Sequence, residues 1–583
     1  MRIGKNLLLL LAMAIVFPTI MKAQANSDYY QQIVKMKDGT ELRFVPDESS
    51  RLVVSRKEDN ANRHLTVKTK EQTYTLDANH VSSISFNYYV PEEHTLSKEI
   101  ESDIRYSLFV EALKRTGLMD SIASISSKTC EFTMLPFGNL QSPYPANECR
   151  RGFTVFAEPD SVMCLHGIFS FEDLVAYANH IYANAAEWYD YLGVNNLPVS
   201  TGDDYTNRQN ALNMFVSYHI LNTAIPTNWL VYEHSNNVYW NYKPDASPHD
   251  YYETMLPSTL IKVCQPYPDN RIFLNRYQTN STLTDVVGTT GSLLIHELKR
   301  EGAEVLRTGN TISAYNGYVH SIGDMLVYDE MVPHGVLNER MRFNCTSLMP
   351  ELITNGWRQY VAGELPDGDY DKGRVGIPLD YSDNIVFKNA GLCMEYLLHG
   401  AYSNYQSDGL LIWGNGSQFD ISIKLPPVPA GKYEIRIPYS PFVDSGIVQF
   451  YWGKDNSSMI PQGIPVDFRT EATDPRIGWT SYLDEADNGV ASDKMLRNMG
   501  YMRGPYIYCG HGELGWSETN NCRAGSNGTV ILRKIIGQVT MDGQSSWLRI
   551  RGVMEGSMMI SLDCIELCPA SVYDNKEYSE DWY

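Results

Sequence analysis

The sequence lacks the features that mark a nucleic-acid-binding or zinc-binding chain. Its 583 residues include 48 Lys and Arg against 69 Asp and Glu, which gives a net charge of −21 and no basic stripe. Because a phosphate backbone is bound by clustered basic side chains, we expect no nucleic-acid partner. No Cys-x-x-Cys repeat is present, and we expect no metal site and no cofactor.

Catalytic motifs are also missing. There is no Gly-x-Ser-x-Gly elbow and no phosphate-binding loop, and the His-Glu pair at 296–297 lacks the second histidine of a helical zinc-protease site. Glycoside hydrolysis needs two carboxylates about 5 to 10 Å apart. The neighbouring acids at 329–330 and 484–485 would instead point to opposite faces of a strand. We therefore expect a protein that is not an enzyme, with a glycoside hydrolase as the less favoured alternative.

Only one long apolar run is visible, at residues 7–17. It follows Arg2 and Lys5 and precedes the small-residue site Ala-Gln-Ala at 23–25, so residues 1–25 have the pattern of a signal peptide. No cysteine follows the run, which argues against a lipid anchor, and no later segment approaches the ~20 apolar residues of a spanning helix. We expect an exported protein without a transmembrane segment, located in the periplasm, at the cell surface or outside the cell.

The ten cysteines are few and irregularly spaced. This spacing excludes a dense disulfide framework, although an exporting compartment permits single bridges. Cys130 with Cys149, and Cys509 with Cys522, have separations that would close a loop of sensible size. Spacing alone leaves the pairing open.

Residues 27–90 are expected to form a small β leader domain. Two alternating segments flank Asp38 and Gly39, and Asp-Gly is the favoured dipeptide of a two-residue hairpin. Further alternating segments continue this β meander at 64–68, 72–76 and 81–86. The unit resembles the leader of many exported proteins of polysaccharide-using gut bacteria, which implies a spacer or docking module. The expected linker is 90–94.

The first of four motifs in residues 95–335 is an amphipathic helix. Residues 107–118 read SLFVEALKRTGL, and apolar residues recur there at helical spacing. The apolar face is expected to contain Ile104, Leu108, Phe109, Ala112 and Leu113. Gly117 should end the helix in a left-handed conformation.

The other three motifs follow in order. Residues 153–160 (FTVFAEPD) and 316–327 (NGYVHSIGDMLV) have the pattern of buried strands, with His320 expected as a hydrogen-bonded framework residue in the second. Between them, residues 212–221 (LNMFVSYHIL) have the pattern of a buried helix that ends in Tyr218 and His219.

These four motifs, in this order, resemble the signature of the fasciclin domain. The resemblance implies an enlarged α+β fasciclin module over residues 95–335, in which a β-sandwich wedge is flanked by helices and is used for cell adhesion or for holding partners at a cell surface. It also implies a binding role for the Tyr-His pair, Tyr218 and His219. The residue pattern itself favours a structural role, because a His on an apolar helix face is usually a satisfied core residue.

This chain departs from the fasciclin pattern in two ways. Residues 165–210 and 226–255 are long insertions rich in Tyr, Asn and Trp, and we expect them to have changed the binding surface. The turn at 157–160 reads Ala-Glu-Pro-Asp where a second small residue is common in the family.

Residues 336–378 are expected to be a linker or irregular region. Pro, Gly and Asp crowd into 363–373, which is typical of a boundary loop. Three aspartates near a glycine also permit a calcium loop, but the spaced oxygens and final Glu of a helix-loop-helix calcium site are missing. A solvated linker is the favoured interpretation.

Residues 379–570 have the pattern of an antiparallel β-sandwich. In 419–425 and 432–439, apolar residues alternate with charged ones, so one face of each strand should pack and the other should meet water. Further strand patterns occur at 447–452, 546–551 and 559–567. The order resembles galactose-binding-like jelly rolls, including carbohydrate-binding modules. The insertion at 465–525 has no counterpart there, and 571–583 form an acidic tail.

Aromatic residues in the last domain suggest a glycan-binding surface. A sugar platform needs one or two rings exposed near a loop. Trp413 precedes Gly-Asn-Gly-Ser and Trp452 precedes Gly-Lys-Asp, so both are the predicted glycan-binding residues. Trp547 lies within a strand pattern and could face either the core or solvent.

The sequence as a whole predicts a multidomain, mostly β protein with one α+β module, exported and not catalytic. We expect it to act in adhesion or carbohydrate binding, with a glycan or a cell-surface protein as the partner. A structural accessory subunit that docks onto an outer-membrane complex is the alternative.

Overall fold

A computed structural model of the chain is mostly β, with several antiparallel sheets and fewer helices. It describes residues 29–37, 41–44, 51–55, 64–68, 73–77, 79–89, 91–130, 148–231, 249–266, 271–284, 293–306, 311–358, 374–398, 408–414, 418–439, 441, 444–471, 474–477, 490–503, 532–554 and 559–574. The signal-like segment 1–25, the boundary loop 363–373 and most of the acidic tail lie outside this description. The chain divides into two compact units, Met1–His94 and Thr95–Tyr583.

The first unit contains two three-stranded sheets rather than one continuous meander. In one sheet β1 is central and pairs with β2 in antiparallel register, as predicted, while the Asp38-Gly39 turn lies outside the described residues. Val34 is fully buried and packs against Leu76, which belongs to the second sheet. The strands are β1 (Tyr29–Met36), β2 (Glu41–Phe44), β3 (Arg51–Ser55), β4 (His64–Lys68), β5 (Thr73–Asp77) and β6 (Val81–Tyr89).

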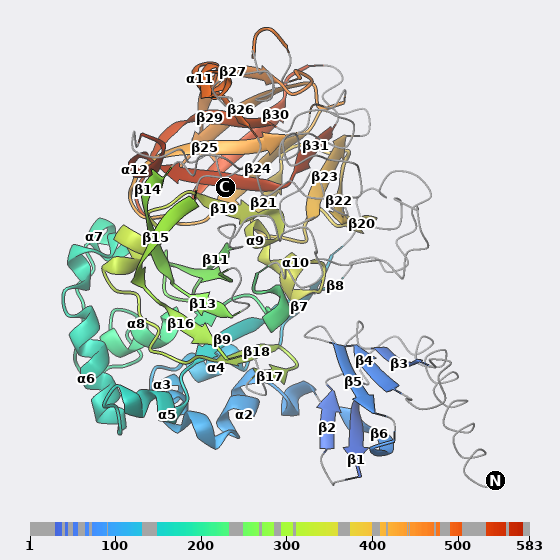
Figure 1. Cartoon of the computed structure of the whole chain (residues 1–583), viewed down its shortest axis with the longest axis vertical. Helices are drawn as coiled ribbons and strands as arrows, with labels where there is room; N and C mark the ends of the chain where they lie inside the picture. The colour runs from blue at the N-terminus through green and yellow to red at the C-terminus, as the bar shows by residue number, and fades with distance from the viewer. Residues whose placement is uncertain are drawn as a thin grey trace. The chain divides into compact units, whose positions relative to one another are not determined.

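The second unit begins with helices that cover a sheet ordered β10-β9-β18-β17 (Figure 1). Its central pair, β9 and β18, is parallel, and Val155 lies opposite Val319. The two segments that were predicted as buried strands are thus neighbours in one sheet. The strands are β9 (Phe153–Ala157), β10 (Ile220–Leu221), β17 (Thr311–Ala314) and β18 (Gly317–Ser321), and the helices are α2 (Leu96–Glu101), α3 (Ser107–Arg115), α4 (Leu118–Ile122), α5 (Asp160–Leu165), α6 (Phe171–Tyr182), α7 (Asp190–Asn195) and α8 (Ala211–Tyr218).

Helix α3 largely follows the prediction. Phe109, Ala112 and Leu113 are buried in the same core as Val155 and Val319, and Leu108 packs partly against it. Gly117 has φ +73 and separates α3 from α4, as predicted. Ile104 was wrongly placed on the buried face. It lies in a 3₁₀ turn before α3 and is 90% exposed, because the helical periodicity begins only at Ser107.

Two further β elements follow the helices. One is a sheet ordered β11-β12-β13-β16, and the other is the hairpin β14-β15. Their bounds are β11 (His249–Glu253), β12 (Leu260–Cys264), β13 (Ile272–Leu274), β14 (Tyr277–Thr284), β15 (Leu293–Arg300) and β16 (Ala303–Val305). A short hairpin, β7 (Ser127–Thr129) with β8 (Glu148–Arg150), precedes β9 in the chain.

Part of the expected linker 336–378 is instead packed structure. Strand β19 (Met341–Asn344) pairs with β32 (Cys564–Pro569) near the other end of the chain. Helices α9 (Cys345–Leu348) and α10 (Pro350–Thr354) follow it, with Leu348 and Leu352 buried. A strand that pairs with so distant a segment leaves no local pattern long enough to be recognised.

The C-terminal third contains the expected antiparallel strands. One sheet has the order β19-β32-β25-β29-β28 and another the order β21-β24-β30-β26-β27, and side chains from both enter one buried cluster. A smaller sheet is ordered β20-β22-β23-β31. The strands are β20 (Arg374–Ile377), β21 (Ile385–Phe387), β22 (Leu392–Leu398), β23 (Asp408–Gly414), β24 (Asp420–Leu425), β25 (Gly431–Tyr439), β26 (Ile447–Gly453), β27 (Ile460–Asp467), β28 (Tyr501–Arg503), β29 (Leu532–Met541), β30 (Ser546–Gly552) and β31 (Met559–Leu562).

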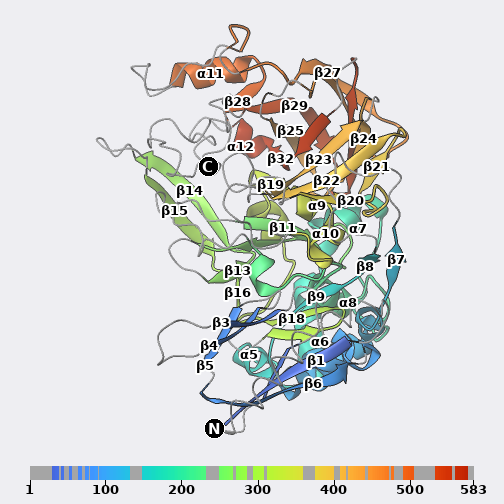
Figure 2. The ribbon, with the colours of Figure 1, turned by 90° about the vertical axis from the view of Figure 1, so that its right-hand side faces the viewer.

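Consecutive strands β24 and β25 lie in different sheets, so the turn at 429–431 crosses between layers and does not close a hairpin. Figure 2 shows β21 and β24 on the side of this region away from α11 (Val490–Asn498) and β28. One expectation was wrong. The charged face of β25, with Glu434 and Arg436, does not meet water, because both side chains are buried. Among the helices that the structure describes, none is both long and apolar enough to span a bilayer.

Candidate functional site

Tyr218 and His219 lie at the end of α8, deep in the second unit. The helix starts at Asn210, whose side-chain oxygen accepts a hydrogen bond from Leu212 N at 2.9 Å. Every residue of α8 is buried, and the side chains of both Tyr218 and His219 are fully buried. In this conformation neither side chain can touch a partner directly.

His219 is held by Glu158, the residue by which this chain departs from the fasciclin turn. His219 Nδ1 lies 2.7 Å from Phe215 O and donates to it, because a carbonyl can only accept. His219 Nε2 lies 2.9 Å from Glu158 Oε1, which also accepts from Leu326 N at 3.0 Å. The contact between the imidazole and the carboxyl group joins the end of α8 to the end of β9.

Tyr218 anchors a second set of contacts. Its hydroxyl donates to Leu260 O at 3.0 Å and accepts from Asn275 Nδ2 at 2.8 Å. Burial raises the pKa of Tyr218, so the phenol stays protonated. Its ring centroid lies 5.2 Å from that of Tyr328.

Aromatic residues of the insertion 165–210 complete this cluster. Trp188 lies 5.8 Å and Tyr189 5.3 Å, between ring centroids, from Tyr328. The Tyr182 hydroxyl accepts a hydrogen bond from Tyr328 N at 3.3 Å. Tyr182 and Tyr189 of the insertion are therefore core residues, and Trp188 is partly buried against the same core.

His320 is the hydrogen-bonded framework residue that the sequence predicts. Its Nε2 lies 2.9 Å from Ile225 O, to which it donates. Burial lowers the pKa of His320 to about 4, so the ring is neutral at pH 7. It therefore joins β18 to the segment that follows β10.

Trp413 and Trp452 lie in different sheets and do not form one platform. Trp413, on β23, is partly exposed and packs beside Leu411 and Met559. Trp452, on β26, lies opposite Leu548 and therefore shares its core-facing side. Trp452 is partly buried, and its Nε1 donates to Ser546 Oγ at 3.1 Å.

The outer face of the same sheet carries a different row of side chains. Tyr451, Arg549 and Trp547 all point away from the core, because they alternate with buried Phe450, Leu548 and Ile550. Arg549 donates to both carboxylate oxygens of Asp420, at 2.7 and 2.6 Å.

The Arg549 guanidinium also lies 5.1 Å from the centroid of the Tyr451 ring. It is thereby fixed between a carboxylate on β24 and an aromatic ring on β26. Trp547 lies two residues from Arg549 along β30, opposite Lys424. We call Asp420, Arg549, Tyr451 and Trp547 the outer row. The residues combine apolar rings with a fixed charge on a partly exposed surface.

The alternation in Trp547-Leu-Arg549-Ile-Arg551 could have placed Trp547 on the polar face from sequence alone. The same reasoning for Phe450 and Trp452 places Trp452 on the apolar face. Strand alternation is therefore a better guide to exposed rings than a position near a loop. Trp413 and Trp452 were predicted from their positions near loops, and the outer row was missed for that reason.

The other sheet carries a buried row of charges. Glu566 on β32 lies opposite Arg342 on β19 and Arg436 on β25. It accepts from Arg342 Nη2 at 2.6 Å and from Arg533 Nη1 at 3.1 Å. The arginines hold the pKa of Glu566 well below its usual range, although burial opposes them.

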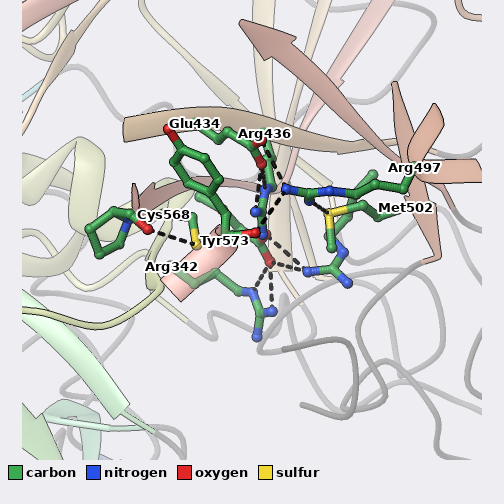
Figure 3. Close-up of polar contacts among 10 residues, drawn as sticks. Arg342, Glu434, Arg436, Arg497, Met502, Cys568 and Tyr573 are labelled. Atoms are coloured by element: carbon green, nitrogen blue, oxygen red, sulfur yellow. Dashed lines mark hydrogen bonds and ion pairs between the residues drawn. The ribbon is translucent and has the colours of Figure 1, made fainter. Parts of the chain in front are cut away.

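Figure 3 shows Arg342, Arg436 and Arg497 entering one cluster with Glu434. Arg436 Nη2 donates to Glu434 at 2.7 Å, and Arg497 Nη2, from α11, donates to it at 2.9 Å. We call Glu566 with Arg342, Arg436 and Arg533 the buried row. All three arginines lie against the single Glu566 carboxylate inside the fold, which is a structural arrangement.

The acidic pairs considered for catalysis do not form a dyad where they are described. The Asp329 carboxylate accepts a hydrogen bond from Arg300 Nη1 at 2.7 Å. The Glu330 carboxylate instead lies 3.8 Å from His334 Nδ1. The acids at 484–485, the side chains at 296–297 and the pair Cys509 and Cys522 lie outside the described residues. Within the described ranges, no group of three or more His, Cys, Asp or Glu is arranged to hold a metal ion.

A buried carboxylate pair lies near Arg358. Asp250 accepts from Arg358 Nη2, and Asp408 accepts from Asn344 Nδ2 at 2.8 Å and from the Tyr396 hydroxyl at 3.1 Å. Burial raises the pKa of Asp408 to about 6. Both carboxylates are inaccessible to solvent, and the neighbouring side chains donate hydrogen bonds to them. This arrangement is typical of a structural role.

Comparison with known proteins adds little. No protein-family model matches the chain, and no curated protein matches it. Among solved structures, a domain pair from the insect cell adhesion molecule fasciclin I is similar at 11% identity and a TM-score of 0.21, over 54% of this chain and 75% of that chain. The insecticidal crystal protein Cry2Aa is similar at 10% identity and a TM-score of 0.18, over 69% of this chain and 66% of that one. Such low scores support no conclusion about this chain.

Proposed function

We propose that this chain is an exported, non-catalytic binding protein that holds a glycan on the outer face of its C-terminal sandwich. The N-terminal part of the second unit is a fasciclin-like adhesion module. Support for that module comes from the parallel pairing of β9 with β18, two motifs more than 150 residues apart in the sequence. The buried helix α8 ends beside them at His219, as the family resemblance implies.

The outer row carries the glycan proposal. Sugar rings present C–H faces that pack on aromatic rings, and hydroxyl groups that bind charged side chains. Tyr451 and Trp547 supply rings on neighbouring strands, and Asp420 fixes the Arg549 guanidinium beside them. A side chain that is already fixed loses little entropy when a ligand binds, which favours recognition.

Protein docking is the second candidate, and a different surface favours it. Strand β27 lies at the edge of the same sheet, where Ile460 is 67% and Ile464 83% exposed. Exposed apolar side chains on a sheet edge suit a protein partner better than a sugar. An accessory subunit docked onto an outer-membrane complex would use such an edge.

A polysaccharide array with the full chain separates these two candidates. Binding should be detected, and Trp547→Ala should weaken it by ~1–3 kcal/mol, the usual loss for an aromatic anchor. Arg549→Ala should weaken binding as well. The matched control is Arg476→Ala, because Arg476 also pairs with an aspartate, Asp474, at 2.8 Å but lies on an exposed loop.

Two results would overturn the glycan proposal. One is a folded full chain that binds nothing on the array, and the other is binding that Trp547→Ala and Arg549→Ala leave unchanged. In the first case, loss of a co-purifying membrane complex on Ile464→Asp would support docking through β27.

A further inference from the structure

Two buried cysteines lie at the base of the hairpin formed by β7 and β8. In this hairpin Lys128 lies directly opposite Cys149. Cys130 is two residues beyond Lys128, so it faces the same side and is the diagonal neighbour of Cys149. Both cysteine side chains are almost completely buried, and in the structure both are thiols.

The two sulfur atoms converge on one short segment of the sandwich region. Cys130 Sγ lies 3.9 Å from Asp380 O, and Cys149 Sγ lies 3.4 Å from Tyr381 O. These carbonyls belong to consecutive residues. The fold therefore brings both thiols to the same place, although 18 residues separate them in the sequence.

Ion pairs and hydrogen bonds also join the hairpin to this segment. Lys128 Nζ lies 3.1 Å and Arg151 Nη2 lies 3.6 Å from the Asp383 carboxylate. The Tyr381 hydroxyl donates to Glu148 O at 3.2 Å and accepts from Trp357 Nε1 at 3.0 Å. The hairpin thus joins the fasciclin-like part of the unit to the strands that begin the sandwich.

We propose that Cys130 and Cys149 form a disulfide that closes this hairpin where it contacts residues 380–383. Diagonal neighbours in an antiparallel pair have Cα atoms about 7–8 Å apart, while disulfides usually need less than about 7 Å. Closure therefore requires a shift on the order of 1 Å, estimated from the same two ranges. Cys130 lies just beyond the last paired residue of β7, where the backbone is free of the ladder.

The chemistry is thiol–disulfide exchange with an external disulfide as the oxidant. One cysteine thiolate attacks a sulfur of the oxidant and releases the other half as a thiol. The second thiolate then attacks the mixed disulfide, forms the Cys130–Cys149 bond and releases the second thiol. Two cysteine thiols are oxidised, one oxidant disulfide is reduced, and the two protons end on the released thiols.

Burial raises the pKa of Cys149 to about 12 in the folded chain. Its thiolate is therefore scarce once the hairpin has packed, and exchange should be faster during folding than afterwards. In the cell the bridge depends on the export that the proposed function includes, because an exporting compartment supplies the oxidant.

The test is peptide mapping of the full chain after refolding from denaturant in a glutathione redox buffer, with free thiols alkylated before a non-reducing digest. We expect a linked peptide pair joining Cys130 to Cys149, lighter by two hydrogens than its parts and lost on reduction. Cys130→Ser should leave Cys149 alkylated, and the reverse variant should leave Cys130 alkylated. The control Cys264→Ser should retain the link, since Cys264 is buried in another sheet.

Alkylation of both cysteines in the refolded wild type, or their linkage to other cysteines, would overturn the proposal. The refolding experiment does not depend on where the chain resides in the cell. A second arm maps the chain recovered from cells. A link in the refolded protein but not in the cellular protein would contradict export and leave the disulfide geometry supported.

Discussion

The two large sheets of the sandwich carry similar charged rows in opposite surroundings. In the buried row, Arg342, Glu566 and Arg436 lie side by side on β19, β32 and β25, with no solvent exposure of the glutamate. In the outer row, Asp420 on β24 and Arg549 on β30 are diagonal neighbours joined by two hydrogen bonds. Their side chains are 15% and 28% exposed.

Burial decides what each row can do. Charges removed from water must be matched by the fold, and removing one partner leaves the others uncompensated. Charges near the surface keep part of their hydration, so their pairing adds little stability and can be exchanged for a ligand. We therefore assign the buried row to architecture, and the outer row is the one that we propose for binding.

The largest expected effect comes from Glu566→Gln, which preserves shape but removes the central negative charge of the buried row. Arg342, Arg436 and Arg533 would then lack their common counter-charge. We expect the free energy of unfolding to fall by ~3–5 kcal/mol, as for other broken buried pairs. Urea unfolding of the full chain measures it, and Asp474→Asn on an exposed loop is the control. A loss below about 1 kcal/mol, the value for surface pairs, would contradict the assignment.

The two rows also show what sequence could and could not predict. Alternation located β24, β25 and β30 within one or two residues, because a half-buried strand leaves a period of two. The same period of two wrongly predicted that the side chains of Glu434 and Arg436 face solvent. Their face is covered by Arg342 from β19 and Arg497 from α11, and no local pattern indicates that segments so distant in the chain will pack there.

The candidate site shows the same limit. The apolar patterns predicted buried strands at 153–160 and 316–327, and the structure pairs them as β9 and β18. The patterns did not predict that Glu158, where the turn differs from the fasciclin pattern, would be buried against His219. Only the fold brings together these two residues, which are 61 positions apart.

A pH series tests the buried row further, with a smaller expected effect on the free energy of unfolding. The folded-state pKa of Glu566 lies below its unfolded value, so its stabilisation is complete above the unfolded pKa, about 4.3, and is lost as pH falls toward the folded pKa. The difference in stability between wild type and Glu566→Gln should therefore shrink below about pH 4. The slope cannot exceed about 1.4 kcal/mol per pH unit for one proton.

Urea unfolding of both proteins at pH 6, 5, 4 and 3, values chosen to bracket the usual glutamate pKa of 4.5, gives this difference directly. Other carboxylates titrate in the same range, but they are common to both chains and cancel in the difference. A constant difference across the series would mean that Glu566 has the same pKa in the folded and unfolded states, and the arginines of the buried row would then not stabilise its charge.

The smallest expected effect on stability comes from Asp420→Asn in the outer row. The substitution keeps one oxygen for Arg549 and removes a charge that is still partly hydrated, so the free energy of unfolding should change by about 1 kcal/mol or less. Binding should respond more strongly, because Arg549 loses the bidentate contact that fixes it over Tyr451. Urea unfolding and titration with a polysaccharide found on the array measure the two effects on one protein. If Asp420→Asn destabilises the chain as much as Glu566→Gln, the outer row is a structural element like the buried one, and its role in binding has to be abandoned.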